Sequence, residues 1–219
     1  MLPSHRSVKV AMETLPAPVP IDRWIPRFVL DRIFCGYYVF QLISTPLLDM
    51  QGTLPTWLYP SWMRAFFTHH LETWRDPWLA DTRAHPWYFG IVFWEYLVQM
   101  PFFFVASYAY YKGAQASPWI RIPVIMYCTQ TITAVTGIIF MALFEDFNDY
   151  TALAPTSTFQ RLKLAFIYSF FLVISFLNLY DTLFSKVYLG PSPQAPGTPV
   201  TPMTEEERNK REMKTQHED

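Results

Sequence analysis

Hydrophobic positions along the chain are gathered into four long stretches, with polar segments before, between and after them. The stretches cover about residues 28–48, 87–111, 120–144 and 162–184. Each is close to the roughly 20 residues that an α-helix needs to cross about 30 Å of hydrocarbon. The pattern therefore predicts an all-α membrane protein, a bundle of four transmembrane helices.

The polar segments divide the chain into three parts. We predict a polar N-terminal segment over 1–27, a four-helix transmembrane domain over 28–184, and a cytosolic tail over 185–219 that is Pro-rich and then charged. The two ends and the 112–121 connection hold eleven Lys or Arg, against five in the other two connections. Because loop cations gather on the cytoplasmic side of a membrane, this bias predicts that both termini are cytosolic.

The connection between the first two stretches contains a shorter amphipathic segment. From Trp62 to Trp74, apolar residues recur at helical spacing at Phe66, Phe67 and Leu71, among polar and charged positions. A helix with one apolar and one polar face lies in the plane of a membrane interface. We therefore expect an interfacial helix in the first loop, lying on or capping the bundle.

Charge and residue types exclude several classes of function. The net charge is −1, whereas nucleic-acid binding needs a basic field that neutralises phosphates, so no nucleic-acid partner is expected. Cys35 and Cys128 both lie inside hydrophobic stretches, which argues against a secreted disulfide framework. His69, His70 and His85 lack the spacing of a tetrahedral metal site, and the sequence has no phosphate loop or nucleophile elbow. We predict no metal and no cofactor.

Polar residues inside the hydrophobic stretches follow helical spacing, so each predicted helix carries one polar stripe. The stripes are Tyr38, Gln41, Thr45 and Asp49; Glu95 and Gln99; Tyr127, Gln130, Thr131 and Ala134; and Tyr168, Ser175 and Asn178, with Phe171 between them. Polar side chains are costly in hydrocarbon and face the interior of a bundle, so the stripes predict one shared cavity. The alternative is that they form interhelical hydrogen bonds worth about 0.6 kcal/mol each.

Glu95 is the residue for which these two interpretations differ most. A carboxyl group well inside a hydrophobic stretch is costly and points to a role in the cavity, whereas a protonated structural Glu bonded to Gln99 is the other interpretation. Pro46, Pro101 and Pro123 lie in or at the ends of the stretches and kink their helices, which leaves room between them. An aromatic-lined cavity with acidic groups suits a flat lipid or a hydrophobic amine.

Several ordered motifs resemble one known family. They are Leu48-Asp49-Met50-Gln51, Leu54-Pro55, Leu58-Tyr59-Pro60, Asp76-Pro77, the run from Glu95 to Phe103 (EYLVQMPFF), Trp119-Ile120-Arg121 with Pro123, and Phe144-Glu145-Asp146-Phe147. In order and spacing they resemble the sigma-2 receptor family, the transmembrane-protein-97 type of the EXPERA superfamily, over about residues 30–180. The two tails have no counterpart in it.

The resemblance implies a four-helix endoplasmic-reticulum protein that binds sterols and cationic amphiphiles in a membrane-embedded pocket. It also implies a role in sterol homeostasis or trafficking and a homodimer among membrane lipids. By resemblance, Asp49 pairs with a ligand amine, and Asp76 is a structural acid that supports it. Together with the stripes, it predicts that the other ligand-binding residues are Glu95, Gln99, Tyr127, Gln130, Thr131, Tyr168 and Phe171. Relatives can have His at the position of Gln130 and Tyr at that of Phe171, so their ligand preference is not transferred.

Two alternatives stay open. A second branch of the superfamily isomerises a sterol double bond and resembles this chain in fold, with a His-x-x-x-Glu on the first helix. This chain has Gln41 and Thr45 there, and neither side chain cycles a proton near neutral pH. A membrane scaffold or trafficking adaptor without an obligatory ligand would explain the polar tails but not the acids along a cavity. We therefore expect a binding protein and not an enzyme.

Overall fold

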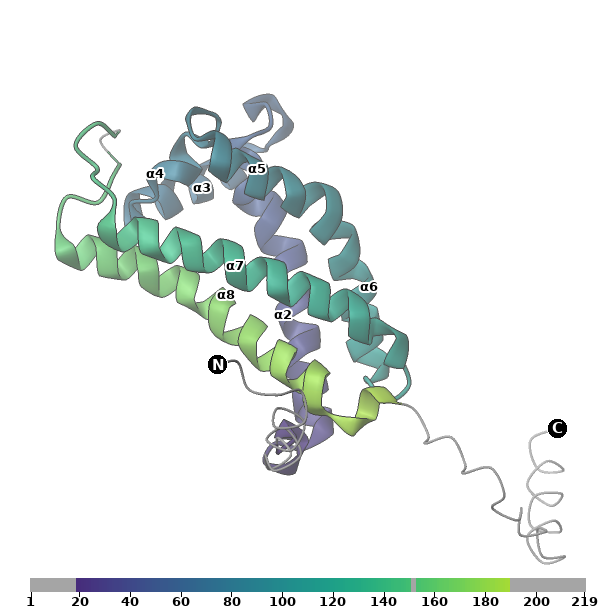
Figure 1. Ribbon diagram of the computed structural model, residues 1–219. Helices are drawn as coiled ribbons and strands as arrows, with labels where there is room; N and C mark the ends of the chain where they lie inside the picture. Colours follow the sequence, from purple (N-terminus) through teal and green to yellow (C-terminus); the bar gives the residue numbers. More distant parts are fainter. Residues whose placement is uncertain (1–18, 151–152, 190–219) are drawn as a thin grey trace, which may run out of the picture.

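The computed structural model describes residues 19–150 and 153–189, which form helices joined by turns and short loops (Figure 1). The α-helices are α2 (Arg27–Leu47), α3 (Ser61–Trp74), α4 (Pro77–Ala80), α5 (Pro86–Trp94), α6 (Met100–Lys112), α7 (Arg121–Phe144) and α8 (Thr158–Phe184). The 3₁₀ turns are η1 (Ile21–Arg23), η2 (Asp49–Gly52), η3 (Thr56–Leu58), η4 (Thr82–Ala84), η6 (Pro118–Ile120) and η7 (Lys186–Leu189). Most of the two predicted tails, 1–27 and 185–219, lies outside the described residues.

Three helical segments are long and apolar enough to cross a membrane, namely Pro86–Lys112, Pro118–Phe144 and Thr158–Phe184. Each has 27 residues, which at 1.5 Å per residue gives a length of about 40 Å. They confirm three of the four predicted spans. A helix also forms at the first stretch, as α2, but its first two turns carry three charged side chains. Its place across the membrane stays a prediction.

The long helices pack in pairs. α7 and α8 lie side by side along much of their length, and α2 packs chiefly against α6 (Figure 1). The short helices α3 and α4 gather at one end of the bundle, beside the start of α5. α3 confirms that the amphipathic segment is helical, with Leu71 buried and with Trp62 and Phe66 exposed. Its location at a membrane interface stays a prediction.

Two clusters of buried apolar side chains hold the bundle together. One is rich in aromatic rings and joins α2, α6 and α7; among its members are Leu30, Phe34, Tyr38, Phe103, Tyr110 and Cys128. The other lies beneath α3 and α4; among its members are Leu71, Trp78, Leu79, Val92, Ile138 and Leu164. Members of both clusters, Tyr127 from the first and Tyr88, Val92 and Ile138 from the second, also line the cavity described below.

A widened turn interrupts the second span. Residues Glu95–Gln99 form a π-helical turn, η5, between α5 and α6, in which the N–H of Met100 bonds to the carbonyl of Glu95. Pro101 has no N–H to donate to the carbonyl of Leu97, so regular α-helical bonding cannot continue through this point. Such turns often occur at functional sites, and this one carries both polar residues of the second stripe.

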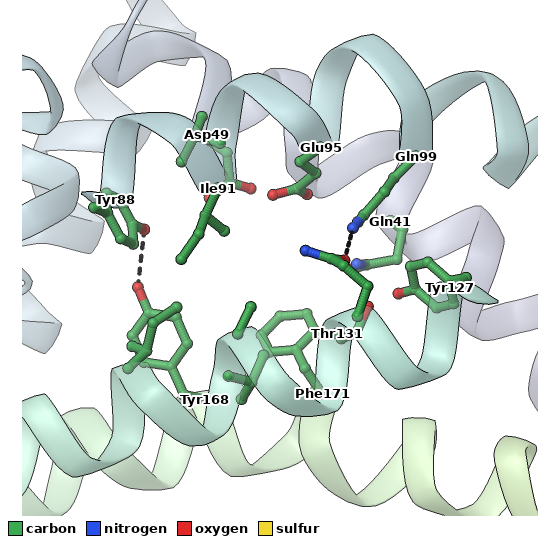
Figure 2. A pocket seen from close by; sticks show the side chains of 15 residues that line it. Gln41, Asp49, Tyr88, Ile91, Glu95, Gln99, Tyr127, Thr131, Tyr168 and Phe171 are labelled. Atoms are coloured by element: carbon green, nitrogen blue, oxygen red, sulfur yellow. Dashed lines mark hydrogen bonds between the residues drawn. The ribbon is translucent and has the colours of Figure 1, made fainter. Parts of the chain in front are cut away.

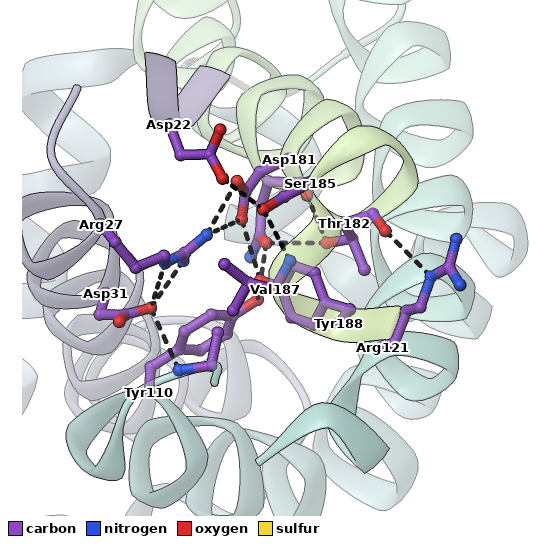
Figure 3. A network of polar contacts seen from close by, with 12 residues as sticks. Asp22, Arg27, Asp31, Tyr110, Arg121, Asp181, Thr182, Ser185, Val187 and Tyr188 are labelled. Atoms are coloured by element: carbon purple, nitrogen blue, oxygen red, sulfur yellow. Dashed lines mark hydrogen bonds and ion pairs between the residues drawn. The ribbon is translucent and has the colours of Figure 1, made fainter. Parts of the chain in front are cut away.

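A buried polar network (Figure 3) lies where α2 begins and α8 ends, at the end of the bundle opposite α3 and α4 (Figure 1). Arg27 pairs with Asp181 at 2.7 Å between Nη1 and Oδ2, and with Asp31 at 2.6 Å between Nη2 and Oδ1. The Tyr188 hydroxyl donates to Asp181 Oδ2 at 2.9 Å, and the N–H of Ala114 donates to Asp31 Oδ1 at 3.3 Å. The network therefore ties α2 to α8, to η7 and to the loop after α6, and it gives both buried carboxylates a cation.

Asn178 adjoins this network and serves packing between helices. Its Nδ2 donates to the Tyr38 hydroxyl at 3.0 Å, and its Oδ1 accepts from the Tyr110 hydroxyl at 2.8 Å. Neither Asn178 nor the fully buried Ser175 lines the cavity described below, so the shared cavity does not extend to these two, and Asn178 instead fits the alternative of interhelical hydrogen bonding. The reason is geometric. Tyr168 and Asn178 are ten residues apart, about 15 Å along α8, and meet different neighbours.

Candidate functional site

A cavity of about 80 Å³ lies where the polar stripes converge (Figure 2). All eight residues predicted to bind ligand line it: Asp49, Glu95, Gln99, Tyr127, Gln130, Thr131, Tyr168 and Phe171. The remaining lining residues are Gln41, Tyr88, Ile91, Val92, Ala134, Val135 and Ile138. They come from all four predicted spans and from η2, so the residues that the sequence groups together do surround one cavity. Their contacts with a ligand stay predictions.

Two carboxyl groups face the cavity from neighbouring elements. Asp49 begins η2, directly after α2, and Glu95 begins η5; Figure 2 shows both side chains pointing into the space between the helices. Thr45, one turn before Asp49, donates a hydrogen bond to Glu95 Oε1 at 2.7 Å. Burial, together with the nearby carboxyls of Glu95 and Asp76, raises the pKa of Asp49 well above its usual value. Among the described residues, neither cavity carboxyl forms an ion pair with a Lys or Arg.

Asp76 lies behind the cavity, where it caps a helix and fixes an aromatic hydroxyl. As the N-cap of α4 it accepts from the N–H groups of Trp78 at 3.1 Å and Leu79 at 3.0 Å. Its other oxygen accepts from the Tyr168 hydroxyl at 2.5 Å, and that hydroxyl lies 3.0 Å from the hydroxyl of Tyr88. Burial raises the pKa of Asp76, although these hydrogen bonds oppose the shift. Asp76 thus positions Tyr168, which lines the cavity of about 80 Å³, but Asp76 does not line that cavity itself.

The end of the cavity away from Asp76 is polar but uncharged. The Nε2 group of Gln99 donates to Oε1 of Gln130, the bond dashed beside Gln99 in Figure 2. Gln41, Tyr127 and Thr131 lie beside this pair. The cavity therefore has two chemically different ends, one with carboxyl groups and the other with carboxamides and hydroxyls.

A second, larger hollow of about 420 Å³ shares Asp49, Tyr168 and Phe171 with the cavity. Its other walls are mostly apolar and consist of Phe40, Ile43, Ser44, Leu47, Leu48, Phe66, His70, Trp74, Asp76, Leu79, Phe166, Ile167 and Phe170. Together the two hollows reach the roughly 300–1,000 Å³ of small-molecule sites. Asp49 borders both, so a charged group placed at Asp49 has space for an apolar body on one side and a polar arm on the other.

Sequence reasoning missed part of the cavity wall. Tyr88 and Val92 precede Glu95 by seven and three residues, and Gln99 follows it by four. Helical spacing therefore places Tyr88 and Val92 on the same face as Glu95 and Gln99. This spacing is the sequence signal by which the two missed residues could have been identified. Val135 and Ile138 on α7 line the cavity as apolar residues, for which the polar stripes give no signal.

Comparison with known proteins links this chain to one family. The profile of EXPERA (EXPanded EBP superfamily) matches residues 62–182. A Xenopus tropicalis protein named Sigma intracellular receptor 2 is 36% identical over 160 residues, which cover 73% of this chain and 91% of the relative. The Homo sapiens protein of the same name is 34% identical over 155 residues, which cover 69% of this chain and 86% of the relative. The matches thus extend over most of each relative.

Proposed function

The chain belongs to the EXPERA family, and we propose that it is a receptor of the endoplasmic-reticulum membrane that binds sterols and hydrophobic amines and serves sterol homeostasis or trafficking. The names of the relatives, Sigma intracellular receptor 2, support the receptor assignment. The resemblance described above supports the ligand class and the compartment. We propose binding, and not catalysis, as its activity.

One observation carries this proposal: Asp49 and Glu95 border a cavity whose other walls are apolar, aromatic or neutral. A partly buried carboxylate without a cation is costly, and a protonated amine would supply the missing positive charge. Opposite charges attract strongly where water is excluded, and the faces of aromatic rings stabilise a cation further. The apolar second hollow offers space for a ring system. An amine with a flat hydrophobic body, or a sterol, meets these requirements.

We also propose how the chain lies in the membrane. α2 is the fourth span of the 28–184 domain, and its packing along α6 and its share in the cavity support this placement. α3 lies at the interface, because its exposed Trp62 and Phe66 are side chains suited to that depth. The segments 1–27 and 185–219 are cytosolic, and the protein forms a homodimer in the lipid bilayer.

Binding of a radiolabelled cationic amphiphile to the purified full-length protein in detergent tests the proposed function. We expect saturable binding by the wild type and displacement by unlabelled sterols. Asp49→Asn keeps the shape of the side chain and removes its charge, so affinity for the amine should fall by about tenfold or more. Asp146→Asn is the matched control, because Asp146 is exposed outside the cavity and accepts the N–H of Asn148.

Two results would contradict the proposal: amine binding that Asp49→Asn leaves unchanged, or no saturable binding by folded wild-type protein. In the second case the next assay is sterol double-bond isomerisation, with Glu95→Gln as the variant. Sterol isomerisation by the wild type that is lost in this variant would show that the protein is an isomerase and would contradict the proposed receptor function. An activity in cells that depends only on residues 185–219 would favour a scaffold.

A further inference from the structure

We propose that the uncharged end of the cavity is a second recognition site, which binds a hydroxyl or carbonyl group on the same ligand whose ammonium group lies at Asp49. This inference rests on the proposed function and specifies its ligand class, namely amphiphilic amines that carry a neutral polar group on a short arm. Gln41, Gln99, Gln130 and Thr131 form the site.

The positions of these residues separate the two recognition sites along the helices. Gln41 precedes Asp49 by eight residues, a rise of about 12 Å, and Gln99 follows Glu95 by four residues, about 6 Å. Gln130 and Thr131 reach the same end from α7. A polar group on the ligand, about 6–12 Å from its ammonium nitrogen, therefore reaches this end. The cavity of about 80 Å³ has room only for a short arm of the ligand.

Unused hydrogen-bonding capacity points to a ligand at this end. Thr131 is 8% exposed, and its Oγ1 makes no hydrogen bond of normal geometry among the described residues; the neighbouring Tyr127 hydroxyl (Figure 2) already bonds to the Tyr37 hydroxyl at 2.8 Å. A carboxamide offers two donors and two acceptor positions. The Gln99–Gln130 bond uses one donor and one acceptor position of that pair. Buried polar groups are normally satisfied, so an open hydroxyl beside carboxamides at a cavity wall indicates a missing partner.

The chemistry of these groups limits what that partner is. Carboxamides and hydroxyls carry no charge and both donate and accept, which suits a hydroxyl group and, through the donors, a carbonyl. A carboxylate on the ligand would be repelled by Glu95, one helical turn away. A second ammonium group would find no carboxylate at this end. The neutral site therefore selects an uncharged dipole, and its hydrogen bonding stays unchanged across physiological pH.

A matched pair of ligands tests this inference: two alkylammonium amphiphiles with the same apolar body, one with a hydroxyl at the end of a short arm and one without it. Competition with the radiolabelled amphiphile gives both affinities. The wild type should prefer the hydroxyl ligand by about three- to tenfold, the size of one or two net hydrogen bonds. Thr131→Val replaces the unpartnered hydroxyl by a methyl group of similar volume, so folding should be unaffected. It should reduce this preference by lowering the affinity for the hydroxyl ligand more than the affinity for the other ligand.

Thr133→Val is the control, because Thr133 lies on the same helix, its exposed hydroxyl donates to the carbonyl of Thr129, and it does not line this cavity. It should keep the wild-type preference. Equal affinities of the wild type for the two ligands, or an unchanged preference in Thr131→Val, would overturn the inference and leave the proposed function intact. Failure of both ligands to bind the wild type would overturn the proposed function and this inference together.

Discussion

Asp181 and Asp49 are both carboxyl groups inside the bundle, but among the ion pairs of the described residues only Asp181 has a cationic partner. At one end of the protein, Arg27 lies 2.7 Å from Asp181 and 2.6 Å from Asp31, and tyrosine and backbone donors complete the arrangement. In the cavity, Asp49 lies near two further carboxyls, those of Glu95 and Asp76, which raise its pKa along with burial. In the first arrangement a cation offsets the negative charge of the carboxylates, whereas the second brings three carboxyl groups together.

This difference distinguishes carboxyl groups that stabilise the fold from carboxyl groups that are available to a ligand. A buried carboxylate that the protein itself pairs becomes costly when its partner is removed. Asp49 is partly buried and forms no ion pair with a Lys or Arg among the described residues, so its carboxylate form is costly as it stands, and an incoming cation relieves that cost. The same substitution, Asp to Asn, should therefore have opposite consequences at the two places.

Asp181→Asn should have the largest effect on stability. It removes one of the two carboxylates that pair with the guanidinium of Arg27, and breaking a buried pair costs about 3–5 kcal/mol. We expect a melting temperature in detergent well below that of the wild type. Arg27→Gln should lower it similarly, because Asp31 and Asp181 then lose their shared cation. A melting temperature unchanged in both variants would show that the network is not structural.

Gly52→Ala should distort the loop that carries Asp49. A Cβ atom at this position would lie 2.8 Å from the backbone carbonyl of Leu79 and closer still to Oγ1 of Thr82. Overpacking of this kind costs about 1–3 kcal/mol, so both the melting temperature and amine affinity should fall. Gly36→Ala is the control, because nothing lies within 4 Å of its Cβ position. Equal behaviour of the two variants would contradict the tight packing of this loop.

Amine affinity should rise with pH as Asp49 loses its proton. A quaternary ammonium amphiphile has a charge that does not change with pH, so the pH dependence of its affinity reports on titration of the protein alone. Below the raised pKa of Asp49, affinity should fall by up to about tenfold per pH unit, because binding then requires release of a proton. In Asp49→Asn the residual binding should vary much less with pH. A flat profile for the wild type, or the same slope in both proteins, would remove Asp49 from the ion pair.

Asp76 should show the smallest effects, because its role is capping and positioning. Asp76→Ala removes the N-cap of α4, which costs about 1 kcal/mol, and also removes the acceptor of the Tyr168 hydroxyl. Asp76→Asn keeps a good capping residue and an acceptor oxygen, so it should melt closer to the wild type. Thermal melting in detergent compares the two, and equal destabilisation would show that capping is not what Asp76 contributes.

Helical periodicity predicted most of the cavity, because cost in hydrocarbon forces polar side chains to one face. Asp49, Glu95 and Gln99 were all identified in this way. The π-turn that carries Glu95 and Gln99 was not, since Pro101 indicates a kink but not the form that it takes. The sequence alone also does not establish that α2 spans the membrane, because its first turns are charged. The structure accounts for Arg27 and Asp31 there as members of the buried polar network.

The terminal network was missed because its members are far apart in the sequence. Arg27 and Asp181 are separated by 154 positions, and each lies near the end of a hydrophobic stretch, where a charged residue is expected in any case. Nothing in either local pattern distinguishes a solvated charge from one half of a buried pair. The sequence left the role of Asn178 open between cavity and interhelical hydrogen bond for a related reason: periodicity gives the face of a helix but not the neighbour that the face meets at each level.

The melting temperature of Asp49→Asn in detergent, without ligand and at neutral pH, tests the central contrast most directly. Because the pKa of Asp49 is raised in the folded state, the folded protein holds this proton more tightly than the unfolded chain does. Asp49 therefore lowers stability as pH rises from the unfolded pKa of about 4 to the folded value, and Asn removes that loss. We predict a melting temperature equal to or above that of the wild type, together with loss of amine binding. A melting temperature lowered as far as in Asp181→Asn, with amine binding retained, would contradict the account.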